Sequence, residues 1–121
     1  MQYSERALSY FDSTTHAGKL EGEGVCSGSA HSEVNGDSIK FYCKILSQNI
    51  VELRFLATGT VSTIVCGEFL SRYLEGKTLD QIEELDAEQI LNALELPLTK
   101  RYSASLAIDA LQAMTLNERT K

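Results

Sequence analysis

The chain contains no tryptophan, one proline, two histidines and three cysteines. A single proline excludes a proline-rich linker. The apolar runs are only a few residues long, whereas a membrane-spanning helix needs roughly 20 apolar residues. Basic residues are also scarce, because 11 Lys and Arg stand against 17 Asp and Glu and leave a net charge of −6. This charge argues against nucleic-acid binding driven by phosphate neutralisation. We therefore expect neither a nucleic-acid nor a membrane partner.

The length of 121 residues corresponds to one domain, which we expect to span residues 1–121. Hydrophobic residues make up 43% of the chain and charged residues 23%, which is ordinary for a soluble protein with one core. No basic segment followed by an apolar one opens the sequence, so we expect no secretory signal and a cytoplasmic location.

The three cysteines, Cys26, Cys43 and Cys66, are too few and too scattered for a disulfide framework. Their number is odd, and no CxxC pair occurs. We expect three reduced thiols, at least two of which pack as small hydrophobic residues. Cys43 in particular is expected in the core.

Alternating apolar and polar residues predict two neighbouring strands, at 37–46 and 50–57. The polar residues 47–49 between them predict an antiparallel hairpin. The residues expected to face the core are Ile39, Phe41, Cys43 and Ile45 in the first strand and Val51, Leu53, Phe55 and Ala57 in the second. Ile50 is expected on the opposite face. The polar stretch 13–24, which contains three glycines, is expected to lead into a first strand.

Apolar residues at helical spacing predict helices on both sides of these strands. The expected helices cover residues 4–12, 62–75, 79–85, 87–94 and 103–115. Four residues are placed to cap helix starts: Ser4, Thr78, Asp86 and Ser103. The order of elements indicates an α+β protein, in which a small antiparallel sheet of about three strands has an N-terminal helix and a C-terminal set of helices packed on one face.

Four short segments occur in the order and spacing of a known family. They are Asn35–Asp37, Phe55–Thr60, Leu74–Asp80 and Leu96–Ser103. Through them the chain, from about residue 8 to about residue 114, resembles the IscU/NifU N-terminal family of iron–sulfur cluster scaffolds. The resemblance implies the SufE/NifU-like α+β fold. SufE-type sulfur acceptors share that fold, but their cysteine signature is absent here.

The departures from the family pattern fall on its ligand positions. By resemblance, the three ligand cysteines of the family correspond to Asn35, Thr60 and Ser103, and the histidine beside the third corresponds to Tyr102. Only the aspartate, Asp37, is kept. Iron–sulfur clusters and zinc are held mainly by thiolates and imidazoles, and a thiolate is the group that accepts sulfur from a persulfide. We therefore expect a lost metal-binding site and no cofactor.

An alternative is a working scaffold whose ligands for an iron–sulfur cluster or zinc have moved to Cys26, His31, Asp37 and Cys66. Cys26 and His31 lie about 16 Å apart along an extended strand and on opposite faces, so a shared metal would require a bend, for example at Gly28. The competing interpretation places Cys66 in a helix core, His31 in a solvated loop and Asp37 in an Asn-Gly-Asp turn.

Leu96, Pro97 and Lys100 match the segment that a DnaK-type chaperone recognises on scaffolds of the family. Alternatively, this segment only connects two helices and packs Leu96 and Leu98 on the core. His16, the remaining histidine, is interpreted as a surface residue. The resemblance implies a cysteine desulfurase, a DnaK-type chaperone or an authentic scaffold as partners.

Two functions remain as hypotheses. The first is a degenerate scaffold homologue that acts as a binding or regulatory partner, and the second is the active scaffold with relocated ligands. We do not expect an enzyme, because no Ser/His/Asp or Cys/His pairing at interpretable spacing and no phosphate loop occur in the sequence. Ser103 is interpreted as a helix N-cap rather than a nucleophile.

Overall fold

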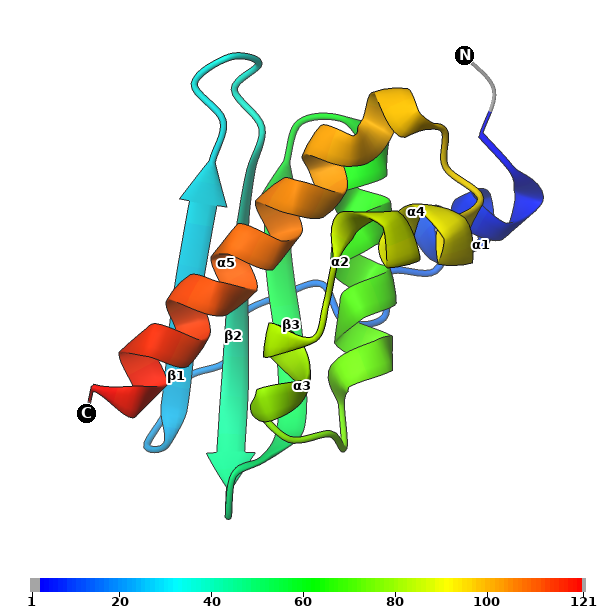
Figure 1. Ribbon diagram of the computed structural model, residues 1–121. Helices are drawn as coiled ribbons and strands as arrows, with labels where there is room; N and C mark the ends of the chain where they lie inside the picture. Colours follow the sequence, from blue (N-terminus) through cyan, green and yellow to red (C-terminus); the bar gives the residue numbers. More distant parts are fainter. Residues whose placement is uncertain (1–2, 121) are drawn as a thin grey trace.

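A helix, three strands and a second group of helices follow one another in the computed structural model, which describes residues 3–120 (Figure 1). The elements are α1 (Glu5–Asp12), β1 (Val25–His31), β2 (Ser38–Leu46), β3 (Asn49–Thr58), α2 (Val61–Leu74), α3 (Asp80–Glu83), α4 (Ala87–Leu94), the 3₁₀ turn η1 (Leu98–Lys100) and α5 (Arg101–Arg119). This order confirms the predicted α+β class. None of the helices in the described part of the chain has the length and apolar character needed to cross a membrane.

The sheet is antiparallel, with strand order β1-β2-β3. The hairpin between β2 and β3 confirms the predicted pair of strands. The pairing shifts by one residue between Lys44 and Ile45, so that Ile45 lies opposite Ile50 and Val51 bulges out of the ladder. As a result Ile50 is fully buried and Val51 is 47% exposed. The prediction that placed Val51 inside and Ile50 outside is therefore wrong, since strict alternation carries no sign of a bulge.

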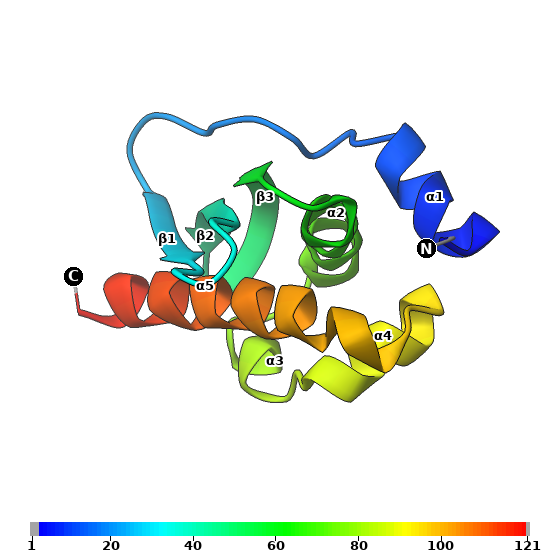
Figure 2. The same ribbon diagram turned by 90° about the horizontal axis from the view of Figure 1, so that it is seen from above.

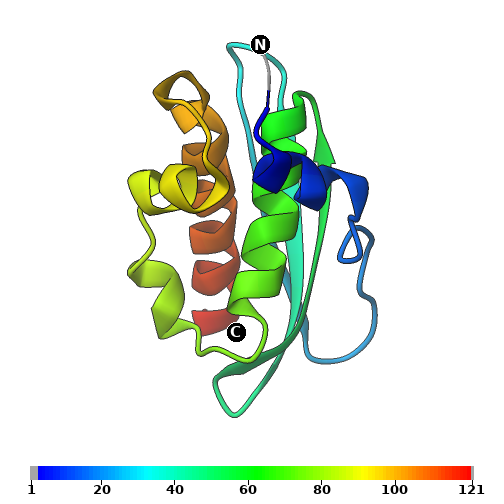
Figure 3. The same cartoon turned by 90° about the vertical axis from the view of Figure 1, so that its right-hand side faces the viewer.

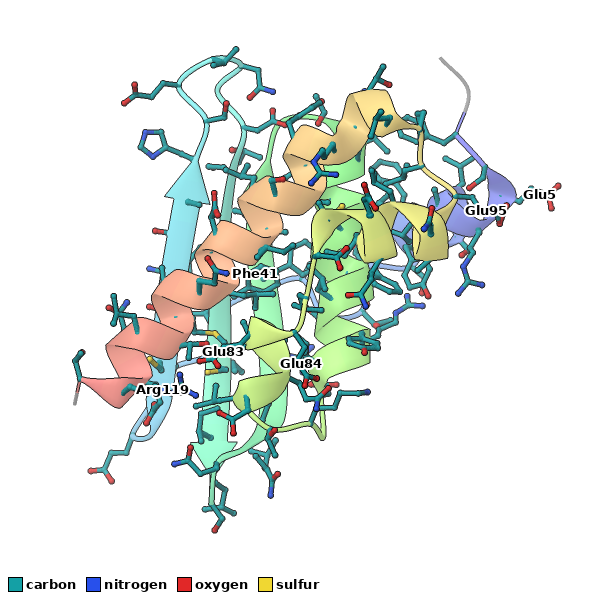
Figure 4. The ribbon with its side chains drawn as sticks, in the orientation of Figure 1. Glu5, Phe41, Glu83, Glu84, Glu95 and Arg119 are labelled. Carbon is teal, nitrogen blue, oxygen red and sulfur yellow. The ribbon has the colours of Figure 1, made fainter. Side chains whose placement is uncertain are left out.

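Two helices, α2 and α5, cover one face of the sheet, as predicted, and α1 packs against α2. Figure 2 shows α5 running beneath the strands, and Figure 3 shows α3 and α4 lying outside α5 and α2. At Gly28 a Cβ atom would lie 2.1 Å from the backbone nitrogen of Met114, so a glycine is needed for α5 to rest on β1. Near the end of α5, Arg119 pairs with Glu83 of α3 (Figure 4).

Segment 13–24 crosses the opposite face of the sheet from α5 on its way to β1 (Figure 2). Its anchor is His16, whose Nδ1 lies 2.8 Å from Glu68 Oε2 and whose Nε2 lies 2.7 Å from Glu75 Oε1. The Glu68 side chain is fully buried and also accepts a hydrogen bond from Arg72 at 2.7 Å. The interpretation of His16 as a surface residue is wrong, because both of its ring nitrogens contact carboxylates. These carboxylates lie more than 50 residues away in the sequence, so no local sequence pattern predicts the contacts.

The core lies between the sheet and the helices. Its largest fully buried side chains include Phe41, Phe55, Ile39, Leu53, Leu70, Leu74 and Leu111. All three cysteines are buried, and Cys43 and Cys66 have no exposed surface, as expected of small hydrophobic residues.

Two of the four predicted helix caps form. The side chain of Ser4 accepts a hydrogen bond from the backbone of Ala7, and Asp86 forms the predicted capping box. Thr78 does not cap a helix; instead it forms a bridge to Asn49, and α3 is reduced to a single turn. Ser103 does not cap α5 either, because η1 precedes the helix and moves its start to Arg101.

Candidate functional site

Asp37 is the buried acidic residue at the end of the sheet where α2 and α5 begin. The turn before β2 places it there: Gly36 has a φ of +77°, and Asn35 Oδ1 accepts a hydrogen bond from the backbone N–H of Asp37 at 3.0 Å. This is the turn chemistry expected of Asn-Gly-Asp. The Asp37 side chain, however, is not used within the turn. It points inward, and the residue is only 1% exposed.

The carboxylate of Asp37 accepts three hydrogen bonds from the start of α2. Its Oδ1 accepts from the backbone N–H of Thr60 at 3.2 Å, and its Oδ2 accepts from Thr60 Oγ1 at 2.8 Å and Thr63 Oγ1 at 2.9 Å. Gly59 allows this approach, since a Cβ there would lie 2.0 Å from Asp37 Oδ1. In all three bonds the oxygens of Asp37 are the acceptors, so the start of α2 directs its donors at this one side chain.

Further hydroxyl groups extend this arrangement into α5. Ser103 Oγ lies 2.6 Å from Ser62 Oγ and 3.0 Å from Thr63 Oγ1, and all three side chains are buried. The Thr63 hydroxyl thus has two acceptors within reach, Asp37 Oδ2 and Ser103 Oγ, and its single proton can go to only one of them at a time. The hydroxyl of Tyr102 donates to Thr60 Oγ1 at 3.2 Å, and this bond is the main cause that lowers the pKa of Tyr102.

We refer to these side chains as the Asp37 network, and its members are Asp37, Thr60, Ser62, Thr63, Tyr102 and Ser103. The structure thus brings together four of the five residues that the resemblance assigned to the cluster site. The fifth, Asn35, is exposed and holds only the turn. Sequence reasoning missed Ser62 and Thr63, although three hydroxyl residues within four positions at a helix start were a usable signal.

The donor set of the Asp37 network does not fit an iron–sulfur cluster or a zinc ion. It offers one carboxylate and hydroxyl groups, whereas these groups are held mainly by thiolates and imidazoles. Both oxygens of Asp37 are already engaged, and each neighbouring hydroxyl is hydrogen bonded to another member. Between residues 3 and 120, no three His, Cys, Asp or Glu side chains gather in a way that could hold a metal ion.

The four residues of the relocated-ligand hypothesis do not meet. Cys26 lies in β1 opposite Cys43, and its thiol donates to the carbonyl of Met114 at 3.4 Å. His31 is at the other end of β1, with a side chain 70% exposed. Cys66 is enclosed in α2, where burial raises its pKa to about 12 and keeps the thiol protonated. A protonated, enclosed thiol is not a metal ligand.

The segment before α5 combines buried and exposed residues. Leu96 is 7% exposed and belongs to the core, whereas Leu98 is 70% exposed, so the expectation that both pack inward is wrong for Leu98. Pro97 is exposed and extended, with ψ of 160°. The ammonium group of Lys100 lies 5.7 Å from the ring centre of Tyr3 and 5.9 Å from that of Tyr102. Leu98 and Pro97 thus present an apolar surface to solvent beside the Asp37 network.

The similarity of this chain to known proteins extends over almost its whole length. The family model of the NifU-like N terminal domain matches residues 2–120. The iron–sulfur cluster assembly scaffold protein IscU of Escherichia coli K12 is 29% identical over 124 residues, which cover 100% of this chain and 97% of that protein. The protein of the same name from Azotobacter vinelandii is 27% identical with the same coverage.

Solved structures share the fold. One is a putative iron–sulfur cluster assembly scaffold protein for the SUF system from Fervidobacterium islandicum AW-1, with a TM-score of 0.77, 18% identity, and coverage of 93% of this chain and 96% of that one. Another is the N-terminal part of a NifU-like protein from Brucella abortus, with a TM-score of 0.71, 14% identity, and coverage of 96% and 91%.

Proposed function

Because this chain belongs to the NifU-like N-terminal domain family, and is thereby related to iron–sulfur cluster assembly scaffolds, we propose that it acts in the cytoplasm as a binding or regulatory partner in cluster assembly and does not assemble clusters itself. It has no catalytic activity of its own in this role. One observation carries the proposal: the positions that correspond by resemblance to ligand cysteines supply hydroxyl groups to the Asp37 network.

The chemistry of these groups supports the proposal. A hydroxyl of Thr or Ser stays protonated at neutral pH, so Thr60 and Ser103 offer no nucleophile of the kind that takes sulfur from a persulfide. The carboxylate of Asp37 is held by three donors and would have to give them up to bind iron. Iron and sulfide are the cargo of a scaffold, and this site has no group suited to either.

We infer that the Asp37 network stabilises the fold and does not bind iron or sulfide. It joins the start of β2 through Asp37, the start of α2 through Thr60 and Thr63, and the first turn of α5 through Ser103. Hydrogen bonds between side chains therefore hold these three elements together. A protein of this kind keeps the outer surfaces of a scaffold and remains folded when no cluster is bound.

The partners we propose are a cysteine desulfurase, a DnaK-type chaperone or an authentic scaffold. For the chaperone, the support is the exposed Leu98 next to the extended Pro97, since an extended apolar segment suits a peptide-binding groove. Leu98→Asp is expected to weaken chaperone binding to the full-length protein at least tenfold in a fluorescence titration. Leu116→Asp, at a similarly exposed leucine of α5, is the matched control.

The decisive experiment is anaerobic reconstitution with ferrous iron, a cysteine desulfurase supplied with cysteine, and a dithiol reductant that releases the persulfide sulfur as sulfide. The wild-type protein is expected to give no stoichiometric cluster chromophore. The variant Asn35→Cys/Thr60→Cys/Ser103→Cys is expected to gain bound iron and sulfide. A control with as many new thiols at exposed positions, Asn92→Cys/Thr99→Cys/Thr120→Cys, separates site formation from nonspecific iron binding. A stoichiometric cluster on the wild-type protein would overturn the proposal.

A further inference from the structure

The two edge strands of the sheet, β3 and β1, differ in whether another segment of the chain bonds to their outward backbone groups. The edge of β3 is closed by the chain itself, because Gly18 donates to the carbonyl of Phe55 at 2.8 Å and the N–H of Phe55 donates to the carbonyl of His16 at 3.0 Å. No described element pairs with the other edge, formed by β1 (Figure 1).

The outward backbone groups of β1 can be identified from their neighbours. The carbonyl of Ser27 turns away from β2, because it accepts a hydrogen bond from Asn117 Nδ2 at 2.8 Å. Backbone direction alternates along a strand, so Ser29 and His31 turn outward as well. Within residues 3–120, no group outside the sheet bonds to the main chain of Ser29 or His31. The open part of the edge therefore runs from Ser29 to His31.

This edge lacks the usual protection against strand pairing. Edge strands in natural proteins commonly carry lysine, proline or a bulge that discourages a further strand. The strand Val25–His31 contains no proline and no lysine, and its register with β2 is unbroken. The edge is therefore available for a further strand.

A shallow cavity of about 290 Å³ lies on the outer face of the sheet beside this edge. Its lining includes Ser29, His31, Ser38, Lys40, Leu56 and Thr58, and we call it the edge hollow. Lys40 lies directly opposite Ser29 in the register and makes no ion pair with a described carboxylate. In a protein with a net charge of −6, this hollow thus presents the ammonium group of Lys40, which lies 5.0 Å from the centre of the Tyr42 ring, and the exposed imidazole of His31, which lies 4.0 Å from Glu33 Oε1.

We propose that an extended segment of a partner protein adds to β1 at Ser29–His31 and places acidic side chains at alternate positions over the edge hollow. Neighbouring strands lie about 4.8 Å apart, and side chains on one face recur every second residue. An acidic side chain opposite Ser29 reaches over that short residue toward Lys40, and one two positions away faces His31. The partner motif is acidic–apolar–acidic in β conformation.

Charge favours an acidic partner segment over the β1 strand of a second copy of this chain. The β1 strand of another copy carries no carboxylate between Val25 and His31, so it would leave Lys40 without an acidic partner. A partner segment with two carboxylates supplies a charge opposite in sign to that of Lys40, an acceptor for the His31 ring and the same backbone hydrogen bonds.

The test is an NMR titration of the full-length protein with two blocked peptides. The first is Thr-Val-Glu-Val-Glu-Val-Thr, and the second has Gln in place of both Glu. The first is expected to bind roughly fivefold more tightly, as exposed ion pairs allow, and to shift the amide signals of Ser29 and His31. Lys40→Gln is expected to remove most of this preference. Lys44→Gln, on the same strand but outside the edge hollow, is expected to preserve it.

The variant Ser29→Pro tests the backbone pairing independently of charge. An outward N–H is not needed for folding, so the variant is expected to keep its thermal stability and lose peptide binding. Equal binding of both peptides, no binding at millimolar concentration, or a dimer of the free protein joined at Ser29 would each overturn the proposal. The experiment needs no iron, sulfide or desulfurase, so its failure is distinguishable from failure of the proposed function.

Discussion

At the residue scale, the Asp37 network surrounds one buried carboxylate with hydroxyl groups from the starts of α2 and α5. Asp37 is buried, and burying a carboxyl group is costly unless donors surround it. Thr60 and Thr63 supply those donors, and Thr63 also lies within hydrogen-bond distance of Ser103. Each substitution in this group leaves a buried polar atom without a partner, so its effect on stability should exceed that of a surface change.

We expect Asp37→Asn to lower the free energy of unfolding by about 2 kcal/mol, because an amide nitrogen would face hydroxyl donors and the charge-assisted bonds would be lost. Urea denaturation monitored by circular dichroism measures this change. Asp109→Asn, at an exposed position of α5, is the control and should change stability by less than about 0.5 kcal/mol. Equal effects of the two substitutions would contradict the buried role of Asp37.

The thiol of Cys66 is expected to resist alkylation at pH 8 in the folded protein and to react once urea unfolds the chain. Burial raises its pKa from 9.0 to about 12, so the folded state holds the proton more tightly than the unfolded state. This contribution to stability is complete below about pH 9 and is lost as the pH rises toward 12. Peptide mapping by mass spectrometry after iodoacetamide treatment checks the labelling. Rapid labelling of Cys66 in the native protein would refute the prediction.

At the scale of elements, single residues fix two contacts. One is the contact of segment 13–24 with α2, and the other is the contact of α5 with β1. His16 fastens segment 13–24 to α2 through Glu68 and Glu75, and this holds the backbone pairing that closes the β3 edge. Gly28 lets α5 approach β1. Neither contact is local in sequence, so each ties together parts of the chain that would otherwise separate.

We expect His16→Ala to release segment 13–24 and lower the free energy of unfolding by about 1–3 kcal/mol, since the buried carboxylate of Glu68 loses a donor. Native-state hydrogen exchange should show the amide of Gly18 losing its protection. His31→Ala, which removes an exposed imidazole, is the control. Unchanged protection of Gly18 in His16→Ala would show that the pairing with Phe55 alone holds the segment.

Gly28→Ala is expected to destabilise the protein by about 3 kcal/mol, because the new Cβ would lie 2.1 Å from the Met114 nitrogen and backbone cannot move aside as a flexible side chain can. Thermal unfolding measures the loss. Ser27→Ala, the neighbouring position on the other face of β1, should have a small effect, and a comparably large one would argue against the close approach at Gly28.

The same elements show what the sequence allowed us to predict. The hairpin, the capping box at Asp86 and the cap at Ser4 follow from local patterns and are confirmed. The bulge at Val51 and the start of α5 before Ser103 depend on tertiary packing, which overrides alternation and capping preference. The network was only partly predictable, because its positions were identified by resemblance but its hydrogen bonds join residues up to 42 positions apart.

At the scale of the whole molecule, the carboxylate of Asp37, which precedes β2, and hydroxyl groups from α2 and α5 close one end of the sheet by hydrogen bonds. We therefore expect the midpoint of thermal unfolding to stay within about 1 °C when a chelator is added to protein purified without one. Scanning calorimetry with and without the chelator measures this, and a fall of several degrees would mean that a bound metal contributes to the native state.

The hydrogen bonds within the Asp37 network also have a consequence for the amount of folded protein in a cell. A ligand stabilises a fold only by binding the native state more tightly than the unfolded one. A homologue that binds no cluster gains nothing from abundant iron and loses nothing when iron is scarce. Its folded population, and with it its resistance to proteolysis, is then set by its own hydrogen bonds. Such a protein would stay at a constant level while the occupancy of true scaffolds rises and falls with the supply of iron.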